Sequence, residues 1–415
     1  MSIVYGKLAI SLLCTILVLI VLFKQHYITS KLEDKNAKSV LGVFWIVFRL
    51  LPFIAVYLIA NYPPTSDVNG FWDEASKASM GQIVYRDFWS PYSPLYAYFL
   101  GIWLKIWYDP KMIVLTMAAM DGVAILVSWH FFRSFQTKGA FLFKALIYFI
   151  LPGSLVLCII GAQEDVWMWL FVALAYLVRE RTLRVEWYAV VLALGLLFTK
   201  AIFVLILVPI FLIERQKLRF MAPMLLIGAV SLAVLYPLVG MEFMQPMDEA
   251  KTLRAPNIPA IINPWFNNQI GVGEKFWNWV GLVLSVGMGI LTALKFKTGQ
   301  YRQMLSRTWV VLFATMMIVQ QSAYSNYIFL FLIPLVFGVI DWKNKTQITI
   351  LLIYNILCVV HPSLWWRAGM PKYLSLSDIT SSSLFMIDYS TQTAIIILTG
   401  YFIKLAFSKE NKLAV

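Results

Sequence analysis

One polar stretch, residues 61–98, concentrates side chains that can exchange protons and bind sugars in an otherwise apolar chain. It carries four acids and two bases, together with many aromatic side chains: Asp67, Asp73, Glu74, Asp87, Lys77 and Arg86. A carboxylate can take the proton of a hydroxyl group, and partial burial tunes its pKa. A plain connection between two membrane helices needs none of this chemistry. We therefore interpret the stretch as the catalytic loop of a membrane enzyme.

The acids of this loop differ in the roles that their positions favour. Asp67 is the preferred candidate for a general base, and the alternative is that it only caps a following helix, as Asp often does. Asp87 is the second candidate, but it follows Arg86 directly and the two could form a surface ion pair of little energetic value. Asp73 and Glu74 are expected to lie on a solvated helix face.

Two cations interrupt apolar runs elsewhere in the chain. Lys200 lies within the run 187–213, which is too long for one crossing, so we predict two short helices that meet near this residue. An ionisable residue inside a membrane segment is a functional hypothesis by default, although a lysine can also extend its amine to the interface. Arg49 lies inside the second apolar run, where we expect it to pair with a buried acid such as Asp121.

Two more polar segments could face the same cavity. The turn GAQED, residues 161–165, connects apolar runs at about 140–160 and 166–178. The segment 361–385 contains His361, Arg367 and Lys372, which could donate hydrogen bonds to a phosphate or a sugar. Its Trp365 and Trp366 could stack on a sugar. The alternative for these tryptophans is an ordinary aromatic belt at the membrane interface.

The composition of the chain indicates that membrane helices position these residues. Of the 415 residues 60% are hydrophobic and only 13% are charged, whereas a soluble domain carries about 25% charged residues. The fold class is therefore predicted as all-α and polytopic. The net charge of +13 fits the enrichment of Lys and Arg in cytoplasmic loops, so it does not indicate nucleic-acid binding. The three cysteines lie in apolar runs and indicate neither a metal site nor a disulfide framework.

The apolar runs predict about twelve or thirteen membrane helices in a single domain, residues 1–415. Residues 1–38 form an extra amino-terminal helix and an inside loop, and the outside loops are 61–111, 240–277 and 361–385. A short apolar piece that begins near Pro94 is expected to form an interfacial helix within the first outside loop. In this threading the amino terminus lies outside and the carboxyl terminus inside.

The order of several motifs resembles the integral-membrane glycosyltransferases of the GT-C superfamily. The first loop has an Asp soon after a membrane helix, then an aromatic, a Gly and a YRDF sequence, which here are Asp67, Phe71, Gly81 and 85–88. The GAQED turn looks like the Gly-Gln-x-Asp turn of this superfamily with one extra or shifted residue. The run around Lys200 and the aromatic helix near Tyr327 are similar to its later motifs, so the resemblance covers about residues 40–335.

The resemblance implies an inverting sugar transfer from a polyprenyl-phosphate donor, of the mannosyltransferase kind, to a lipid, glycan or protein acceptor. Asp67 is then the base, and Asp87 is the second candidate for a catalytic residue. It also implies a site on the outer or lumenal side, with membrane lipids as partners and no cofactor. The short inside loops and the basic carboxyl tail favour the plasma membrane, although an enzyme of the endoplasmic reticulum would have the same layout. Asp67, Asp87 and Asp165 could hold a divalent ion, but we predict no metal. The expected substrate-binding residues are Tyr85, Arg86, Gln163, Glu164, Asp165, Lys200, His361, Trp366 and Arg367.

Two other functions are compatible with many membrane spans. A transporter or flippase for a lipid or polar solute would place charged residues near the middle of the membrane, as Lys200 and Arg49 are placed. A polysaccharide polymerase or ligase would depend on arginines in its outside loops, where only Arg86, Arg254 and Arg367 are available.

Overall fold

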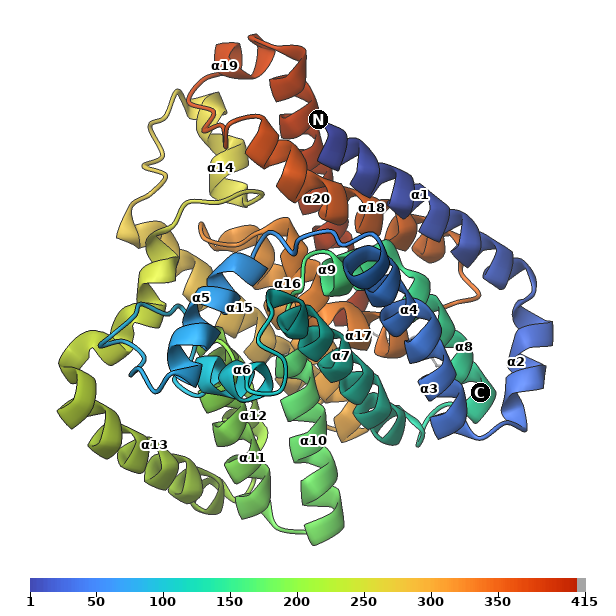
Figure 1. The fold of residues 1–415 in the computed structure, drawn as a ribbon, viewed down its shortest axis with the longest axis vertical. Helices are drawn as coiled ribbons and strands as arrows, with labels where there is room; N and C mark the ends of the chain where they lie inside the picture. Colours follow the sequence, from blue (N-terminus) through green and yellow to red (C-terminus); the bar gives the residue numbers. More distant parts are fainter. Residues whose placement is uncertain (409–415) are drawn as a thin grey trace. The chain divides into compact units, whose positions relative to one another are not determined.

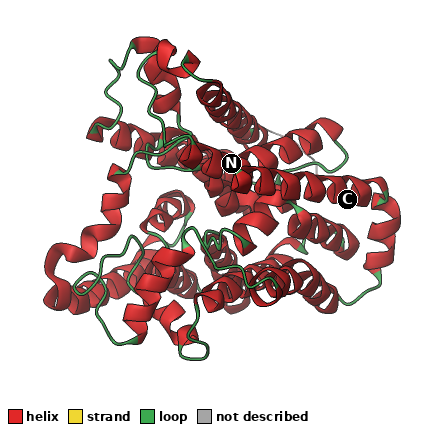
Figure 2. Ribbon diagram, turned by 45° about the horizontal axis from the view of Figure 1, so that its top comes forward, coloured by secondary structure: helices red, strands yellow, loops and turns green. Residues whose placement is uncertain are grey.

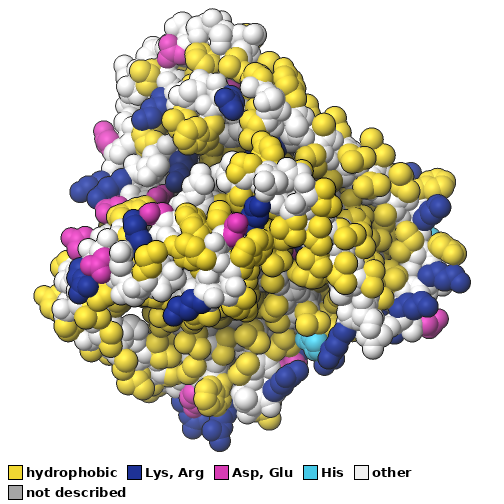
Figure 3. Space-filling model, viewed as in Figure 1, with side chains coloured by type: hydrophobic (Ala, Val, Ile, Leu, Met, Phe, Trp, Pro, Cys, Tyr) yellow, Lys and Arg dark blue, Asp and Glu magenta, His cyan; other side chains and the backbone are white. Residues whose placement is uncertain are grey.

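The computed structural model describes residues 1–408, and all regular secondary structure in this part of the chain is helical (Figures 1 and 2). Seven helical segments are long and apolar enough to cross a membrane, or eight if the bent pair α8 (Lys138–Ile150) and α9 (Pro152–Ile159) is one span. The chain is therefore a polytopic helical membrane protein, as predicted. Apolar side chains cover much of the face seen in Figure 3, as expected for helices that face lipid.

The helices divide into two compact units, each built from separate stretches of the chain. Unit 1 comprises Met1–Gln25, Ile150–Val156 and Ala250–Val415, and unit 2 comprises His26–Phe149 and Leu157–Glu249. Helix α9 and the 3-10 segment η4 (Gly240–Lys251) contribute residues to both units.

Unit 2 contains the predicted catalytic loop, and helix α10 packs against both α7 and α11. Helix α5 packs against α6 and α7, and α11 packs against α13. The helices are α2 (Gln25–Glu33), α3 (Ala37–Trp45), η1 (Ile46–Leu50), α4 (Leu51–Phe53), η2 (Ile54–Ile59), α5 (Val68–Ser79), α6 (Tyr96–Leu104), α7 (Pro110–Phe132), α8, α10 (Val166–Thr182), α11 (Val185–Phe198), η3 (Ala201–Phe203), α12 (Val204–Ile213) and α13 (Lys217–Val239).

Unit 1 packs α16 against α15, α17 and α20, and α18 against α1 and α20. Its helices are α1 (Ser2–Phe23), α14 (Ile258–Ile262), η5 (Asn263–Phe266), α15 (Lys275–Phe296), α16 (Tyr301–Val319), η6 (Ser325–Tyr327), α17 (Ile328–Gly338), α18 (Lys345–Arg367), α19 (Leu376–Thr380) and α20 (Ser383–Phe407).

The second predicted span is one continuous helix, Ala37–Ile59, with π-helical turns on both sides of Pro52. Proline removes one backbone donor from a helix, and wider turns accommodate the loss. Within this helix the Arg49 guanidinium donates to Asp121 at 2.8 Å, and both side chains are fully buried. Tyr148 donates to the other oxygen of Asp121 at 2.5 Å. The predicted pairing of Arg49 with Asp121 is therefore confirmed.

The apolar run 187–213 is broken at Thr199 and Lys200, as predicted, and forms α11, the single turn η3 and α12. The other predicted short element is α6, which has nine residues. At 1.5 Å per residue it is about 14 Å long, less than half the thickness of the apolar layer.

Two expectations about helix lengths differ from the structure. Reaching twelve or thirteen crossings would require shorter helices such as α10, α11 and α12 to cross as well, because within residues 1–408 only seven or eight segments have the length and apolarity of a full span. In addition, the expected loop 361–385 begins too early, because α18 continues to Arg367. His361 and Trp365 are buried within this part of the helix, beyond the apolar run that is visible in the sequence.

Candidate functional site

Asp67 lies at the start of helix α5 but does not cap it. It occupies the N-cap position, yet its side chain forms no capping hydrogen bond. Instead its Oδ2 atom accepts a hydrogen bond of 2.6 Å from Nε2 of Gln163. The residue is exposed, so the carboxylate can be approached from outside while Gln163 holds it. The simple capping role considered for Asp67 is therefore not what the structure contains.

The GAQED turn brings three polar side chains into the interior of unit 2. Ala162 has a positive φ of 47°, which turns the chain sharply before helix α10 begins. Gln163, Glu164 and Asp165 are only 3%, 2% and 1% exposed. Asp165 lies at the N-cap position of α10, but its side chain makes no capping bond. Both carboxylates are thus available to other partners.

Lys200 is the partner of both carboxylates. Its Nζ atom lies 2.7 Å from Oε1 of Glu164 and 2.6 Å from Oδ1 of Asp165. The break between α11 and α12 makes this possible, because Lys200 lies between α11 and η3 and leaves the regular helical path. We call Asp67, Gln163, Glu164, Asp165 and Lys200 the carboxylate cluster. It joins three segments that the sequence analysis had selected separately.

The same helix break anchors the end of the polar loop 61–98. A broken helix leaves backbone carbonyl groups without their usual donors. Here the carbonyl oxygens of Leu197 and Thr199 accept hydrogen bonds of 3.0 Å from the backbone of Leu95 and Ser93. The aromatic ring of Tyr92 next to this anchor lies under Lys200, with Nζ 5.7 Å from the ring centroid. The loop is therefore fixed directly beside the carboxylate cluster.

Aromatic side chains form one wall beside the cluster. Tyr92 and Tyr96 stack with ring centroids 4.1 Å apart, and Trp167 lies 5.5 Å from Tyr96. The hydroxyl group of Tyr96 and Nε1 of Trp167 are buried without a hydrogen-bond partner among the described residues, and so are Oε2 of Glu164 and Oδ2 of Asp165. Since buried polar atoms are nearly always hydrogen-bonded, these unpaired atoms indicate a place for a polar ligand or water.

Burial changes the protonation of the cluster. Removal from solvent raises the pKa of Glu164 to about 7, with Lys200 opposing the rise and Asp165 adding to it. Burial also raises the pKa of Asp165, and Lys200 again opposes the rise. Because one lysine faces two carboxylates, with Asp67 close by, the cluster carries a negative charge excess that a proton on Glu164 reduces.

Glu74 is buried, which corrects the expectation that it faces water. It is 6% exposed, and its Oε2 atom accepts a hydrogen bond of 2.6 Å from the Ser90 hydroxyl. Burial raises the pKa of Glu74 to about 8, and the Ser90 bond opposes this rise. The neighbouring Asp73 does face solvent and pairs with Lys77 at 2.7 Å. The spacing of Phe71, Glu74 and Ala78 on the apolar side of α5 is the signal that could have identified Glu74.

Asp87 and its neighbours form local contacts that stabilise the middle of the polar loop 61–98. Asp87 pairs with Arg86 at 2.9 Å and accepts a hydrogen bond of 2.7 Å from the backbone of Ile83. The Arg86 hydrogen bond and the Ile83 backbone bond lower the pKa of Asp87. Tyr85, with a positive φ of 71°, donates its hydroxyl hydrogen to the carbonyl of Tyr92. Among the described residues, the hydrogen bonds and the ion pair of Asp87 lie within its own turn, and none of them reaches the carboxylate cluster.

The remaining predicted site residues belong to unit 1. His361 is fully buried in α18, where Nδ1 lies 2.9 Å from the Ser325 hydroxyl and Nε2 lies 3.7 Å from Asp388. Trp366 is 63% exposed, and Arg367 is the last residue of α18. These three were expected in an outside loop and instead belong to helix α18.

No group of three or more His, Cys, Asp or Glu side chains within residues 1–408 has the arrangement of a metal site. Fold and site together define a helical, multi-pass membrane protein with a buried ionic cluster at a helix break. Neither a model of a known protein family, nor a curated protein, nor a solved structure matches this chain.

Proposed function

We propose that the protein is a glycosyltransferase that moves a sugar from a polyprenyl-phosphate donor to a lipid, glycan or protein acceptor. The observation that carries the proposal is the 2.6 Å hydrogen bond between Gln163 and Asp67. It joins the exposed Asp67 of the first loop to the GAQED turn, whose Glu164 and Asp165 both pair with Lys200. The GT-C resemblance had selected both segments independently, so their meeting supports it.

In the proposed reaction Asp67 takes the proton of the acceptor hydroxyl group. The acceptor oxygen forms a bond to the anomeric carbon of the sugar, while the bond from that carbon to the donor phosphate breaks. The polyprenyl phosphate leaves as an anion and the anomeric configuration inverts. Asp67 is suited to this role because Gln163 orients one oxygen and the residue remains exposed.

Lys200 is the proposed contact for the leaving phosphate. Its amine already touches two carboxylates, so an incoming phosphate must displace one of them. Glu164 is the group that yields, because its raised pKa lets it take a proton near neutral pH. The aromatic wall of Tyr92, Tyr96 and Trp167 offers faces for a sugar or a prenyl chain.

We place this reaction on the outer face of the plasma membrane and expect it to need no divalent metal. Asp87 and Arg86 remain in the proposal as residues that shape the loop around the site.

The test uses purified full-length protein in lipid nanodiscs with radiolabelled polyprenyl-phosphate mannose or glucose and an extract of membrane glycolipids as acceptor. Replacing a general base typically costs about 100- to 10,000-fold in rate, so Asp67→Asn should lose nearly all transfer. Asp73→Asn is the matched control, because it removes an exposed carboxylate from the same helix. Full activity in Asp67→Asn would remove Asp67 as the base, and an undiminished rate in EDTA would support a metal-free reaction.

A further inference from the structure

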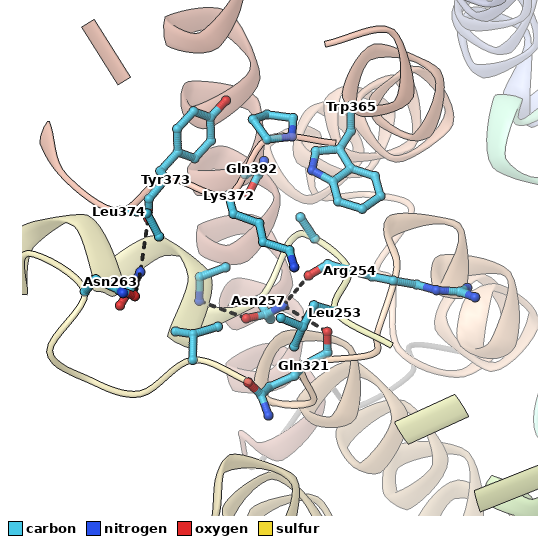
Figure 4. Close-up of a pocket in the computed structure, with 15 residues that line it drawn as sticks. Leu253, Arg254, Asn257, Asn263, Gln321, Trp365, Lys372, Tyr373, Leu374 and Gln392 are labelled. Carbon is cyan, nitrogen blue, oxygen red and sulfur yellow. Dashed lines mark hydrogen bonds between the residues drawn. The ribbon is translucent and has the colours of Figure 1, made fainter. Parts of the chain in front are cut away.

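Unit 1 contains a cavity that the proposed reaction does not use (Figure 4). It has a volume of about 70 Å³ and lies where the chain before α14, the end of α18, the segment after it and α20 meet. Its polar lining includes several amide side chains, a tryptophan and a lysine: Asn257, Asn263, Gln321, Gln392, Trp365 and Lys372.

Hydrogen bonds to the backbone fix two of the amide walls. The Asn257 side chain accepts from Ala260 at 2.9 Å and donates to the carbonyl of Arg254 at 2.7 Å. Gln321 donates to the carbonyl of Glu274 at 3.1 Å and accepts from the backbone of Gly273. These walls are therefore held in place before any ligand arrives, which lowers the entropic cost of binding.

A buried carboxylate fixes the opposite wall. Asp388 is fully buried, and its Oδ2 atom accepts hydrogen bonds from Tyr373 at 2.8 Å and from Gln392 at 2.6 Å. Both donors line the cavity. Asp388 itself does not line the cavity, and its hydrogen bonds hold Tyr373 and Gln392 in position.

Two buried polar atoms of the lining lack a partner. Trp365 and Asn263 are 5% and 3% exposed, and neither Nε1 of Trp365 nor Oδ1 of Asn263 has a hydrogen-bond partner among the described residues. One is a donor and the other an acceptor. A hydroxyl group can satisfy both kinds of atom, since it donates one hydrogen bond and accepts others.

The charge of the lining has one sign. Lys372 is exposed and its side chain extends toward the middle of the lining residues in Figure 4, whereas the guanidinium group of Arg254 points away. Arg254 lies 5.8 Å from the ring centroid of Tyr324. The described residues that line the cavity include no Asp or Glu. The cavity therefore favours a ligand with a negative charge.

We propose that this cavity binds a sugar that carries a phosphate or a carboxylate, either as a soluble molecule or as the head group of a lipid. The amides and Trp365 recognise hydroxyl groups, the indole ring packs on the sugar face, and Lys372 pairs with the anion. A volume of about 70 Å³ corresponds to a few water molecules, so the cavity admits one end of such a ligand and excludes an acyl chain. This site lies within unit 1 and does not depend on the proposed sugar transfer.

The test is calorimetric titration of the purified full-length protein with mannose 1-phosphate, glucuronate, mannose and inorganic phosphate. We expect both anionic sugars to bind at least about tenfold more tightly than mannose or phosphate alone, because each isolated part forms only some of the hydrogen bonds. A parallel titration with a short-chain polyprenyl-phosphate mannose distinguishes a lipid head group from a soluble sugar phosphate. Equal binding of mannose and mannose 1-phosphate, or no binding of any probe, would overturn the proposal.

Two pairs of variants locate the binding in the cavity. Lys372→Gln and Trp365→Phe should each weaken binding of mannose 1-phosphate about tenfold, since hydrogen bonds to charged or buried groups are the costly ones to lose. Trp279→Phe and Lys275→Gln are the matched controls, because both residues are exposed and neither lines the cavity. An unchanged affinity in both cavity variants, or an equal loss in the controls, would contradict the assignment.

Discussion

Nε2 of Gln163 donates a hydrogen bond of 2.6 Å to Oδ2 of Asp67, and the two residues are 96 positions apart in the chain. The contact connects the turn before α10 with the start of α5. Gln163 also donates to the carbonyl of Gly161 at 3.2 Å, which fixes the amide in its turn. The orientation of the Asp67 carboxylate thus depends on a residue that cannot itself take up a proton.

The first prediction concerns this positioning contact. Gln163→Ala should lower kcat for sugar transfer about 10- to 100-fold, because a misplaced reacting group is costly even when it is present. Gln82→Ala, a change in the same loop but outside the cluster, should leave kcat unchanged. An unchanged kcat in Gln163→Ala would contradict the positioning role.

The second prediction concerns the pH dependence of donor binding. The pKa of Glu164 is raised to about 7, so the protonated form prevails below this pH and frees Lys200 for a phosphate. Between about pH 6 and pH 8 the protonated fraction falls about tenfold, and the KM for donor should rise by a similar factor. Glu164→Gln imitates the protonated form and should show a nearly constant KM. A variant that retains the full pH dependence would exclude Glu164 as the yielding group.

The third prediction concerns Glu74 and stability. Because burial raises its pKa from 4.5 to about 8, the folded state holds this proton more tightly than the unfolded state does. Its contribution to stability is therefore complete below about pH 4.5 and is lost as pH rises through about 8. Glu74→Gln keeps an acceptor for Ser90 without this loss.

The measurement for Glu74 is the melting temperature of the purified protein across this pH range. The advantage of Glu74→Gln over the original protein should be absent near pH 4.5, grow as the pH rises and become constant above about 8. Asp73→Asn, a change at the exposed neighbour, is the control and should give no such pH-dependent gain. A constant difference between Glu74→Gln and the original protein at all pH values would contradict the assignment.

The fourth prediction concerns the buried pair of Arg49 and Asp121. Removing one partner of a buried ion pair typically costs about 3–5 kcal/mol, because the other charge stays buried without compensation. Arg49→Met should therefore lower the melting temperature and the yield of folded protein. The double variant Arg49→Met/Asp121→Asn should recover part of the loss, since it leaves no uncompensated charge. Thermal unfolding in one detergent measures both, and a double variant less stable than the single one would refute the coupling.

Some properties of this protein follow from the sequence alone. The excess of apolar residues requires a membrane, and apolar runs of this length cross it as helices, because a helix satisfies its own backbone groups where lipid offers no partner. The helix break at Lys200 and the pairing of Arg49 with Asp121 were also predictable. An ionisable side chain in an apolar run either needs a partner or interrupts the run, so its position carries information by itself.

Only the tertiary structure decided which polar groups are buried and which of them meet. Asp73 and Glu74 are neighbours of similar chemistry, yet the packing of α5 exposes one and buries the other beside Ser90. His361 was expected in a loop and lies inside α18, where packing against Ser325 and Asp388 replaces solvent. Local sequence patterns show which segments enter the membrane, because the apolar layer imposes the same requirements on every segment. The contact of Gln163 with Asp67 depends on how distant segments pack, and no single segment specifies it.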